Sequence, residues 1–142
     1  MNDVNLLSIG GSDPSAGAGI QSDIKTFSKF NVHGLTVVTA ITGQNTSNFG
    51  IVEPVSKKIL ENQLKTIIED FKIDGIKIGM VYNSEIIKMI YQYLKKLKIP
   101  IVVDPVIKST TGGMLIEKSA IIDFKKLIVP LATIITPNKF EA

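Results

Sequence analysis

The chain has 142 residues, of which 44% are hydrophobic, and this predicts a single domain with a substantial apolar core. It carries a net charge of +3 from basic residues that are all Lys, and its aromatic content of 6% without Trp or Arg argues against a nucleic-acid-binding protein. The absence of Cys excludes a disulfide framework and a cysteine-ligated metal site.

The apolar segments are too short for a membrane span, which needs about 18 or more consecutive apolar residues. The first residues also lack the basic region of a signal peptide, and their apolar run is too short for one. We therefore expect a soluble cytoplasmic protein without a membrane partner. The lysines fall mostly on the polar faces of predicted helices, where solvent exposure is their ordinary role. They are Lys57, Lys58, Lys65, Lys95, Lys96, Lys98, Lys125 and Lys126.

The first half of the chain alternates between strand and helix patterns. A strand is predicted at 4–9, and the glycine-rich stretch 10–19 separates it from a helix that contains 20–27. A second strand is predicted at 35–41. Ser56 is then placed to cap a helix whose apolar residues lie between 60 and 71.

The second half continues the alternation. A strand is predicted at 76–80, followed by a helix that opens at Ser84 and ends before Pro100. A short strand at 101–103, a helix across 121–128 and a last strand at 132–136 complete the pattern. Five such alternations predict an α/β fold, with a mainly parallel central sheet and helices on both faces.

Each predicted strand is followed by polar or glycine-rich residues. In a parallel sheet the carboxyl ends of the strands share one edge, and open α/β sheets bind ligands there. The signals are Gly10-Gly11-Ser12-Asp13, Thr42-Gly43-Gln44-Asn45-Thr46, Gly79-Met80, Asp104-Pro105-Val106 and Thr136-Pro137-Asn138-Lys139-Phe140-Glu141. Five such ends together predict a ligand site at this edge.

The glycine-rich stretch 10–19 matches no common cofactor-binding loop. Ser22 replaces the third glycine of a dinucleotide fingerprint, and Pro14 replaces the last glycine of a nucleophile elbow. The stretch either brings backbone and helix-terminal N–H groups close to a ligand or forms a tight turn.

Asp23 shares a helix face with the apolar Ile20 and Phe27, so its carboxylate needs a partner. That partner is either the glycine-rich loop or a ligand. Gln44 offers the donors and the acceptor that suit the edge of a nitrogen heterocycle, although a polar turn would also explain it.

Acidic residues follow the last two strands. Asp104 suits Mg²⁺ or a phosphate-linked charge. Asn138 and Glu141 are three residues apart, so they either face one ligand or form a helix cap with a capping-box glutamate. His33 lies at the opposite edge of the sheet and is read as structural.

Five segments resemble the hydroxymethylpyrimidine/phosphomethylpyrimidine kinases of thiamine biosynthesis, in the ribokinase-like superfamily. These segments are GSDPSAGAGIQSDIKTF, TAITGQNT, IKIGM, VVDPV and ITPNKFEA, in this order. The resemblance implies an enzyme that uses ATP and Mg²⁺ to phosphorylate 4-amino-5-hydroxymethyl-2-methylpyrimidine and then its monophosphate.

The same resemblance implies roles for eight residues. Those implied for the pyrimidine pocket are Gly11, Asp23, Gln44, Met80 and Val106. Those implied near Mg²⁺ and the ATP phosphates are Asp104, Asn138 and Glu141, with Asp104 and Glu141 as metal ligands. Ala16, where the family usually has Gly, is a departure that would stiffen the loop.

The family continues well beyond the position of Ala142. The later part carries a Gly-Thr-Gly-Cys-like motif with the catalytic base, so no catalytic base is expected in this chain. We therefore expect residues 1–142 to be the N-terminal portion of a single ribokinase-like kinase domain, in a family whose members are often homodimers. A pyridoxal kinase and a non-catalytic pyrimidine-binding module remain as alternatives.

Overall fold

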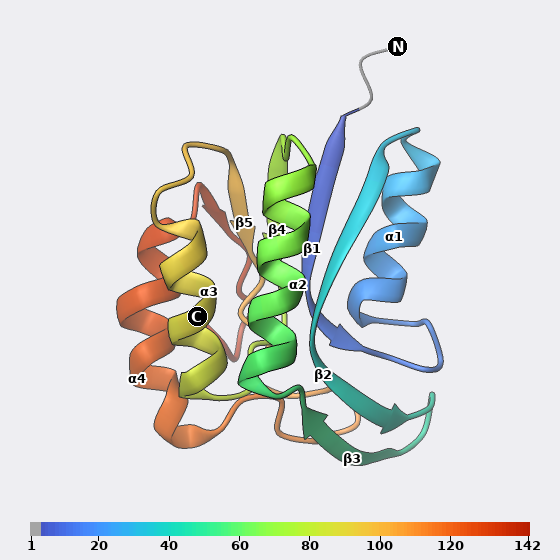
Figure 1. Cartoon of the computed structure of the whole chain (residues 1–142). Coiled ribbons are helices and arrows are strands. Elements are labelled where there is room, and N and C mark those ends of the chain that lie inside the picture. The colour runs from blue at the N-terminus through green and yellow to red at the C-terminus, as the bar shows by residue number, and fades with distance from the viewer. Residues whose placement is uncertain (1–3) are drawn as a thin grey trace.

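The computed structural model describes residues 4–142 (Figure 1). Its strands are β1 (Asn5–Ser12), β2 (His33–Gln44), β3 (Phe49–Pro54), β4 (Gly75–Ile78), β5 (Ile101–Val103) and β6 (Ile134–Ile135). They form one sheet in the order β3-β2-β1-β4-β5-β6. All neighbouring strands pair in parallel except β2 and β3, which are antiparallel.

The helices connect these strands in chain order. They are α1 (Gly19–Lys29), α2 (Lys57–Asp70), α3 (Ser84–Leu94) and a helical segment composed of η1 (Lys118–Ala120), α4 (Ile121–Asp123), η2 (Phe124–Ile128) and η3 (Val129–Leu131). The Ser56 hydroxyl caps α2 by accepting a hydrogen bond from the Ile59 N–H at 3.3 Å, as predicted. The helix α3 opens at Ser84, as predicted, and the Asn83 side chain caps it by accepting from the Ile86 N–H at 3.0 Å.

The two faces of the sheet differ in chemistry. Figure 1 shows α2 and α3 side by side in front of the sheet, where Leu7, Ile9 and Ile78 join the apolar core. Side chains alternate along a strand, so Ser8 and Lys77 point to the other face. Both contact Asp23 of α1 there, which places α1 opposite α2 and α3.

The predicted α/β architecture, with a mainly parallel sheet and helices on both faces, is confirmed. The antiparallel strand β3 was missed. It is an edge strand that contains Gly50 and ends at Pro54, two residues that strands disfavour. β2 also runs three residues further than predicted, and β6 is shorter than the predicted 132–136.

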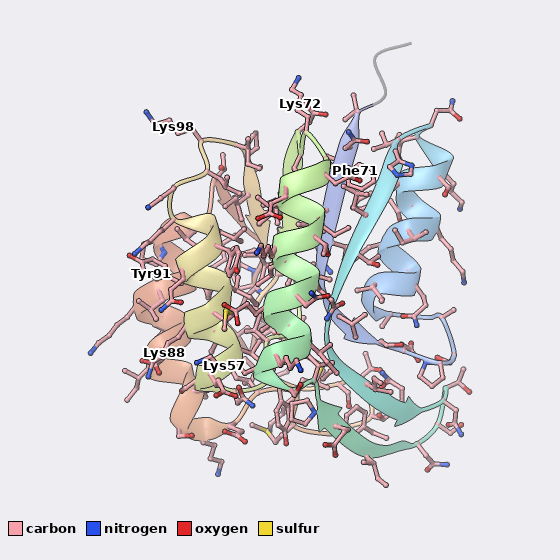
Figure 2. The ribbon with its side chains drawn as sticks, viewed as in Figure 1. Lys57, Phe71, Lys72, Lys88, Tyr91 and Lys98 are labelled. Carbon is pink, nitrogen blue, oxygen red and sulfur yellow. The ribbon has the colours of Figure 1, made fainter. Side chains whose placement is uncertain are left out.

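The lysines lie on the surface as the sequence pattern predicts. All eight lysines expected on polar helix faces are exposed. Figure 2 shows Lys72 and Lys98 extending away from the ribbon. Within residues 4–142, no helix combines the length and the apolar character needed to cross a membrane.

Candidate functional site

A cavity of about 380 Å³ opens at the carboxyl ends of the strands. This volume lies within the range of pockets that bind small molecules. The structure brings all eight residues with predicted ligand roles to its wall, although they come from six separate segments of the chain. They are Gly11, Asp23, Gln44, Met80, Asp104, Val106, Asn138 and Glu141.

Gly11 and Met80 form a close contact in the cavity. A Cβ atom on Gly11 would lie 2.7 Å from the Met80 sulfur, so a side chain at this position would force the thioether to move. The Thr39 hydroxyl donates to the Met80 carbonyl at 2.7 Å, and both residues are buried. The position of Met80 is therefore set by β1 and β2 as well as by its own segment.

Asp13 organises the glycine-rich loop. Its buried carboxylate accepts hydrogen bonds from the N–H and hydroxyl of Ser15, both at 2.8 Å, and from the N–H groups of Gly17 at 3.1 Å and Ala18 at 2.8 Å. Burial acts to raise the pKa of Asp13, but these hydrogen bonds outweigh it and hold the pKa below its ordinary value. Three backbone N–H groups that could have faced a ligand therefore donate to Asp13, and these bonds anchor the loop.

The protein partners of Asp23 are Ser8 and Lys77, and not the glycine-rich loop. Its Oδ2 accepts from the Ser8 hydroxyl at 2.6 Å and lies 3.0 Å from the Lys77 ammonium. Its side chain is 19% exposed, and Asp23 still lines the cavity. Its inward orientation is as predicted, and its role toward a ligand stays a prediction.

The amide of Gln44 is oriented by the strand that carries it. Its Nε2 donates to the Thr42 hydroxyl at 3.0 Å, and that hydroxyl donates to the Ser12 carbonyl at 2.8 Å. Thr42 is buried, so this short chain of hydrogen bonds holds Gln44 at the cavity wall. Asn45, in contrast, accepts from the N–H groups of Ser47 and Asn48 and forms the turn into β3.

Two acidic residues, Asp104 and Glu141, also line the cavity. Burial raises the pKa of Asp104, the Lys77 ammonium lowers it, and the carboxylates of Glu141 and Asp23 raise it, so the net pKa is above its ordinary value. Glu141 and Asn138 bond each other reciprocally, with Asn138 N–H to Glu141 Oε2 at 3.0 Å and Glu141 N–H to Asn138 Oδ1 at 3.1 Å. This is the geometry of the predicted capping box, and residues 139–141 form a turn within it.

The carboxylates of Asp104 and Glu141 are compatible with Mg²⁺. This ion is usually held by one or two carboxylates together with substrate phosphates, and Asp104 and Glu141 both line the cavity. Among residues 4–142, no group of three or more His, Cys, Asp or Glu side chains is placed to hold a metal ion. Magnesium coordination by this pair stays a prediction.

Sequence reasoning missed several cavity residues. Asp13 belongs to the first of the predicted strand-end signals, but no role was predicted for its side chain. Lys77 lies inside a strand, and no local pattern distinguishes it from a surface lysine. Other lining residues that were not predicted include Lys108, Ser109, Thr110 and Leu115. His33 lies outside the cavity and stacks on Phe71 at 5.9 Å between ring centroids, in agreement with a structural role.

Known proteins resemble this chain in both sequence and fold. A family model described as phosphomethylpyrimidine kinase matches residues 13–142. The chain belongs to the phosphomethylpyrimidine kinase family. A hydroxymethylpyrimidine/phosphomethylpyrimidine kinase of Rhizobium meliloti is 43% identical over 136 residues, which cover 96% of this chain and 51% of that relative.

Solved structures of related kinases superpose closely. A phosphomethylpyrimidine kinase from Clostridium difficile 630 has a TM-score of 0.90 and 46% identity, covering 98% of this chain and 61% of that one. A pyridoxal kinase from Staphylococcus aureus, in complex with AMP-PCP and pyridoxal, has a TM-score of 0.85 and 34% identity. The match covers 99% of this chain and 50% of that one. The chain spans about half the length of the curated relatives that it matches.

Proposed function

We propose that this chain forms the substrate-binding part of a kinase that phosphorylates 4-amino-5-hydroxymethyl-2-methylpyrimidine, and then its monophosphate, in thiamine biosynthesis. The observation that carries the proposal is the single cavity lined by all eight residues with implied ligand roles. Membership of the phosphomethylpyrimidine kinase family supports the choice of substrate.

One end of the cavity suits the pyrimidine. Gln44 presents an amide that can pair with a ring nitrogen and an exocyclic amino group. Met80 provides a polarizable thioether for the face of the ring, next to the backbone of Gly11. Asp23 adds a carboxylate, and Val106 adds apolar surface.

The other end suits the phosphates of ATP and their metal ion. Asp104 and Glu141 would supply oxygen ligands to Mg²⁺, while Asn138 holds Glu141 through their reciprocal hydrogen bonds. When bound, ATP supplies the phosphoryl group and Mg²⁺ neutralises its charge.

We assign no residue of this chain as the catalytic base. In our proposal the chain is the N-terminal portion of a single ribokinase-like domain, and its coverage of about half of each matched relative supports this. A cytoplasmic location and a homodimeric assembly complete the proposal, and light scattering tests the second.

Calorimetry with the hydroxymethylpyrimidine tests the binding role directly. We expect binding by the 142-residue chain, and a loss of affinity of about tenfold or more for Gln44→Ala, the range expected when a buried polar contact is lost. Gln92→Ala is the matched control, because Gln92 is exposed on α3. Unchanged affinity in Gln44→Ala would contradict the assignment of the pyrimidine end.

A pyridoxal kinase is the second candidate, favoured by the structural match to the enzyme solved with pyridoxal. Titration with pyridoxal separates the two, since tighter binding of pyridoxal than of the pyrimidine would favour this candidate. Pyrimidine binding without turnover, by the longest natural form of the protein and in the presence of ATP and Mg²⁺, would instead favour a non-catalytic binding module.

A further inference from the structure

Lys77 lines the cavity and lies between two of its carboxylates. Its ammonium nitrogen is 3.0 Å from Asp23 Oδ2 and 3.9 Å from Asp104 Oδ2. The three residues come from the middle of β4, from α1 and from the segment after β5. The side chain of Lys77 is 24% exposed, so much of its length is removed from solvent.

The residues around Lys77 accommodate its ammonium group between the two carboxylates. Ser8, which is fully buried in β1, donates to the same Asp23 oxygen that the ammonium contacts. A Cβ atom on Gly79 would lie 3.1 Å from the Lys77 nitrogen, closer than most Cβ contacts. The glycine two residues further along the chain therefore leaves room for the ammonium group at the end of the strand.

The charges explain why an ammonium is needed there. Asp23 and Asp104 are like charges directed at one partly desolvated cavity, and such charges are costly unless an opposite charge compensates them. The helix α1 and the segment after β5 are far apart in the sequence, so no local backbone connection holds them together. A single cation in contact with both carboxylates provides that link.

We propose that Lys77 is a positioning residue that holds the Asp23 carboxylate in place for the ligand and ties it to Asp104 at the phosphate end. The inference rests on the proposed function, because it concerns the same cavity. Lys77 acts through Asp23, so its removal should weaken ligand binding only while Asp23 is present.

Residues 1–142 contain no Cys, and this allows a sharp test with the 142-residue chain. The Lys77→Cys variant carries a single thiol, which 2-bromoethylamine converts into a near-isosteric lysine analogue, whereas iodoacetamide leaves a neutral side chain. We expect Lys77→Cys to lose about tenfold in affinity for the hydroxymethylpyrimidine, a loss typical of one buried charged contact. Aminoethylation should restore affinity to within about threefold of the unmodified protein, and iodoacetamide should not.

Lys72→Cys is the matched control, since Lys72 is 89% exposed and pairs with Asp74 outside the cavity. It should bind like the unmodified chain before and after alkylation. Recovery of affinity with iodoacetamide, or full affinity in unalkylated Lys77→Cys, would overturn the proposal.

A double-mutant cycle with Asp23→Asn tests whether Lys77 acts through Asp23. We expect the Asp23→Asn, Lys77→Cys double variant to bind no more than about twofold more weakly than the weaker single variant, since neighbouring residues of one network couple non-additively. Losses that multiply would overturn the proposal and indicate a direct contact between Lys77 and the ligand.

The positioning role of Lys77 can be tested even if the proposed substrate is wrong. If the chain binds pyridoxal and not the pyrimidine, the proposed substrate is wrong, and the same cycle is measured with pyridoxal. If neither ligand binds, the double-mutant cycle is measured as stability. The urea midpoints of the unmodified chain, the two single variants and the double variant are then compared. Non-additive shifts in those midpoints would then support the pairing of Lys77 with Asp23, and additive shifts would overturn it.

Discussion

On the face of the sheet covered by α2 and α3, the strands present side chains such as Leu7 and Ile78 that are apolar and fully buried. On the face covered by α1, the same strands present Ser8 and Lys77, and no residue of α1 is fully buried. The comparison shows that the two faces of the sheet have different roles. One face provides the apolar burial that stabilises the fold, and the other provides the polar groups that approach the ligand cavity.

Truncation of one apolar side chain on each face should show the largest difference. Ile90 of α3 is fully buried, and Ile90→Ala should lower the free energy of unfolding by about 3 kcal/mol. Ile24 of α1 is only partly buried, so Ile24→Ala should cost about 1 kcal/mol. Urea denaturation measures both, and equal losses would contradict the division between the faces.

The loop before α1 is expected to tolerate no side chain at Gly19. This residue has a φ of +62°, and a Cβ atom there would clash with the Gly11 carbonyl oxygen. Gly19→Ala should therefore cost roughly 2–3 kcal/mol, from left-handed strain of about 1–2 kcal/mol and from displacement of the loop. Ligand affinity should fall with it, because Gly19 and Gly11 both line the cavity.

Gly112 is the matched control for Gly19. It also has a positive φ, of +94°, but a Cβ atom there would meet nothing within 4 Å. Gly112→Ala should therefore cost only the backbone strain, about 1 kcal/mol. A similar loss of stability in both variants would show that the contact with Gly11 is unimportant.

The Asp13 carboxylate should stabilise the polar side of the molecule in a pH-dependent way. Asp13→Asn keeps the shape of the side chain but removes its charge, so it should cost about 2 kcal/mol at pH 7. Because the folded pKa of Asp13 is lowered, its contribution is complete above the ordinary carboxyl pKa of about 3.9. It is lost as the pH falls through the lower folded pKa.

The measurement is a series of urea denaturations between pH 7 and pH 3. The difference between the unmodified chain and Asp13→Asn should narrow as the pH falls below about 4. Asp70→Asn serves as the control, because Asp70 is exposed at the end of α2. A difference that stays constant across this range would mean that the charge of Asp13 contributes little.

The division between the faces was only partly predictable from the sequence. The cap and apolar spacing of the helix after Ser56 predicted α2, because these signals are local. The spacing around Asp23 likewise predicted that its carboxylate points inward. Its partner Lys77 is 54 residues away, and which side chains meet across a sheet depends on strand order and register. Local patterns do not contain that information.

The same limit applied to β3. Its pairing with β2 follows from the turn that Asn45 builds by accepting two backbone N–H groups, whereas the sequence showed only polar residues after a strand. The eight cavity residues were named through a family resemblance. The parallel sheet explains why such distant segments converge at one edge.

Ala16 permits the smallest change, and one that should stabilise the protein. It has a φ of +58°, a left-handed conformation that costs a residue with a Cβ atom about 1–2 kcal/mol. Ala16→Gly removes this strain but adds about 0.5–1 kcal/mol of conformational entropy to the unfolded chain. The expected net gain is therefore about 0.5 kcal/mol, measurable as a higher urea midpoint. A lower midpoint would mean that the added conformational entropy of the unfolded chain outweighs the strain released at Ala16.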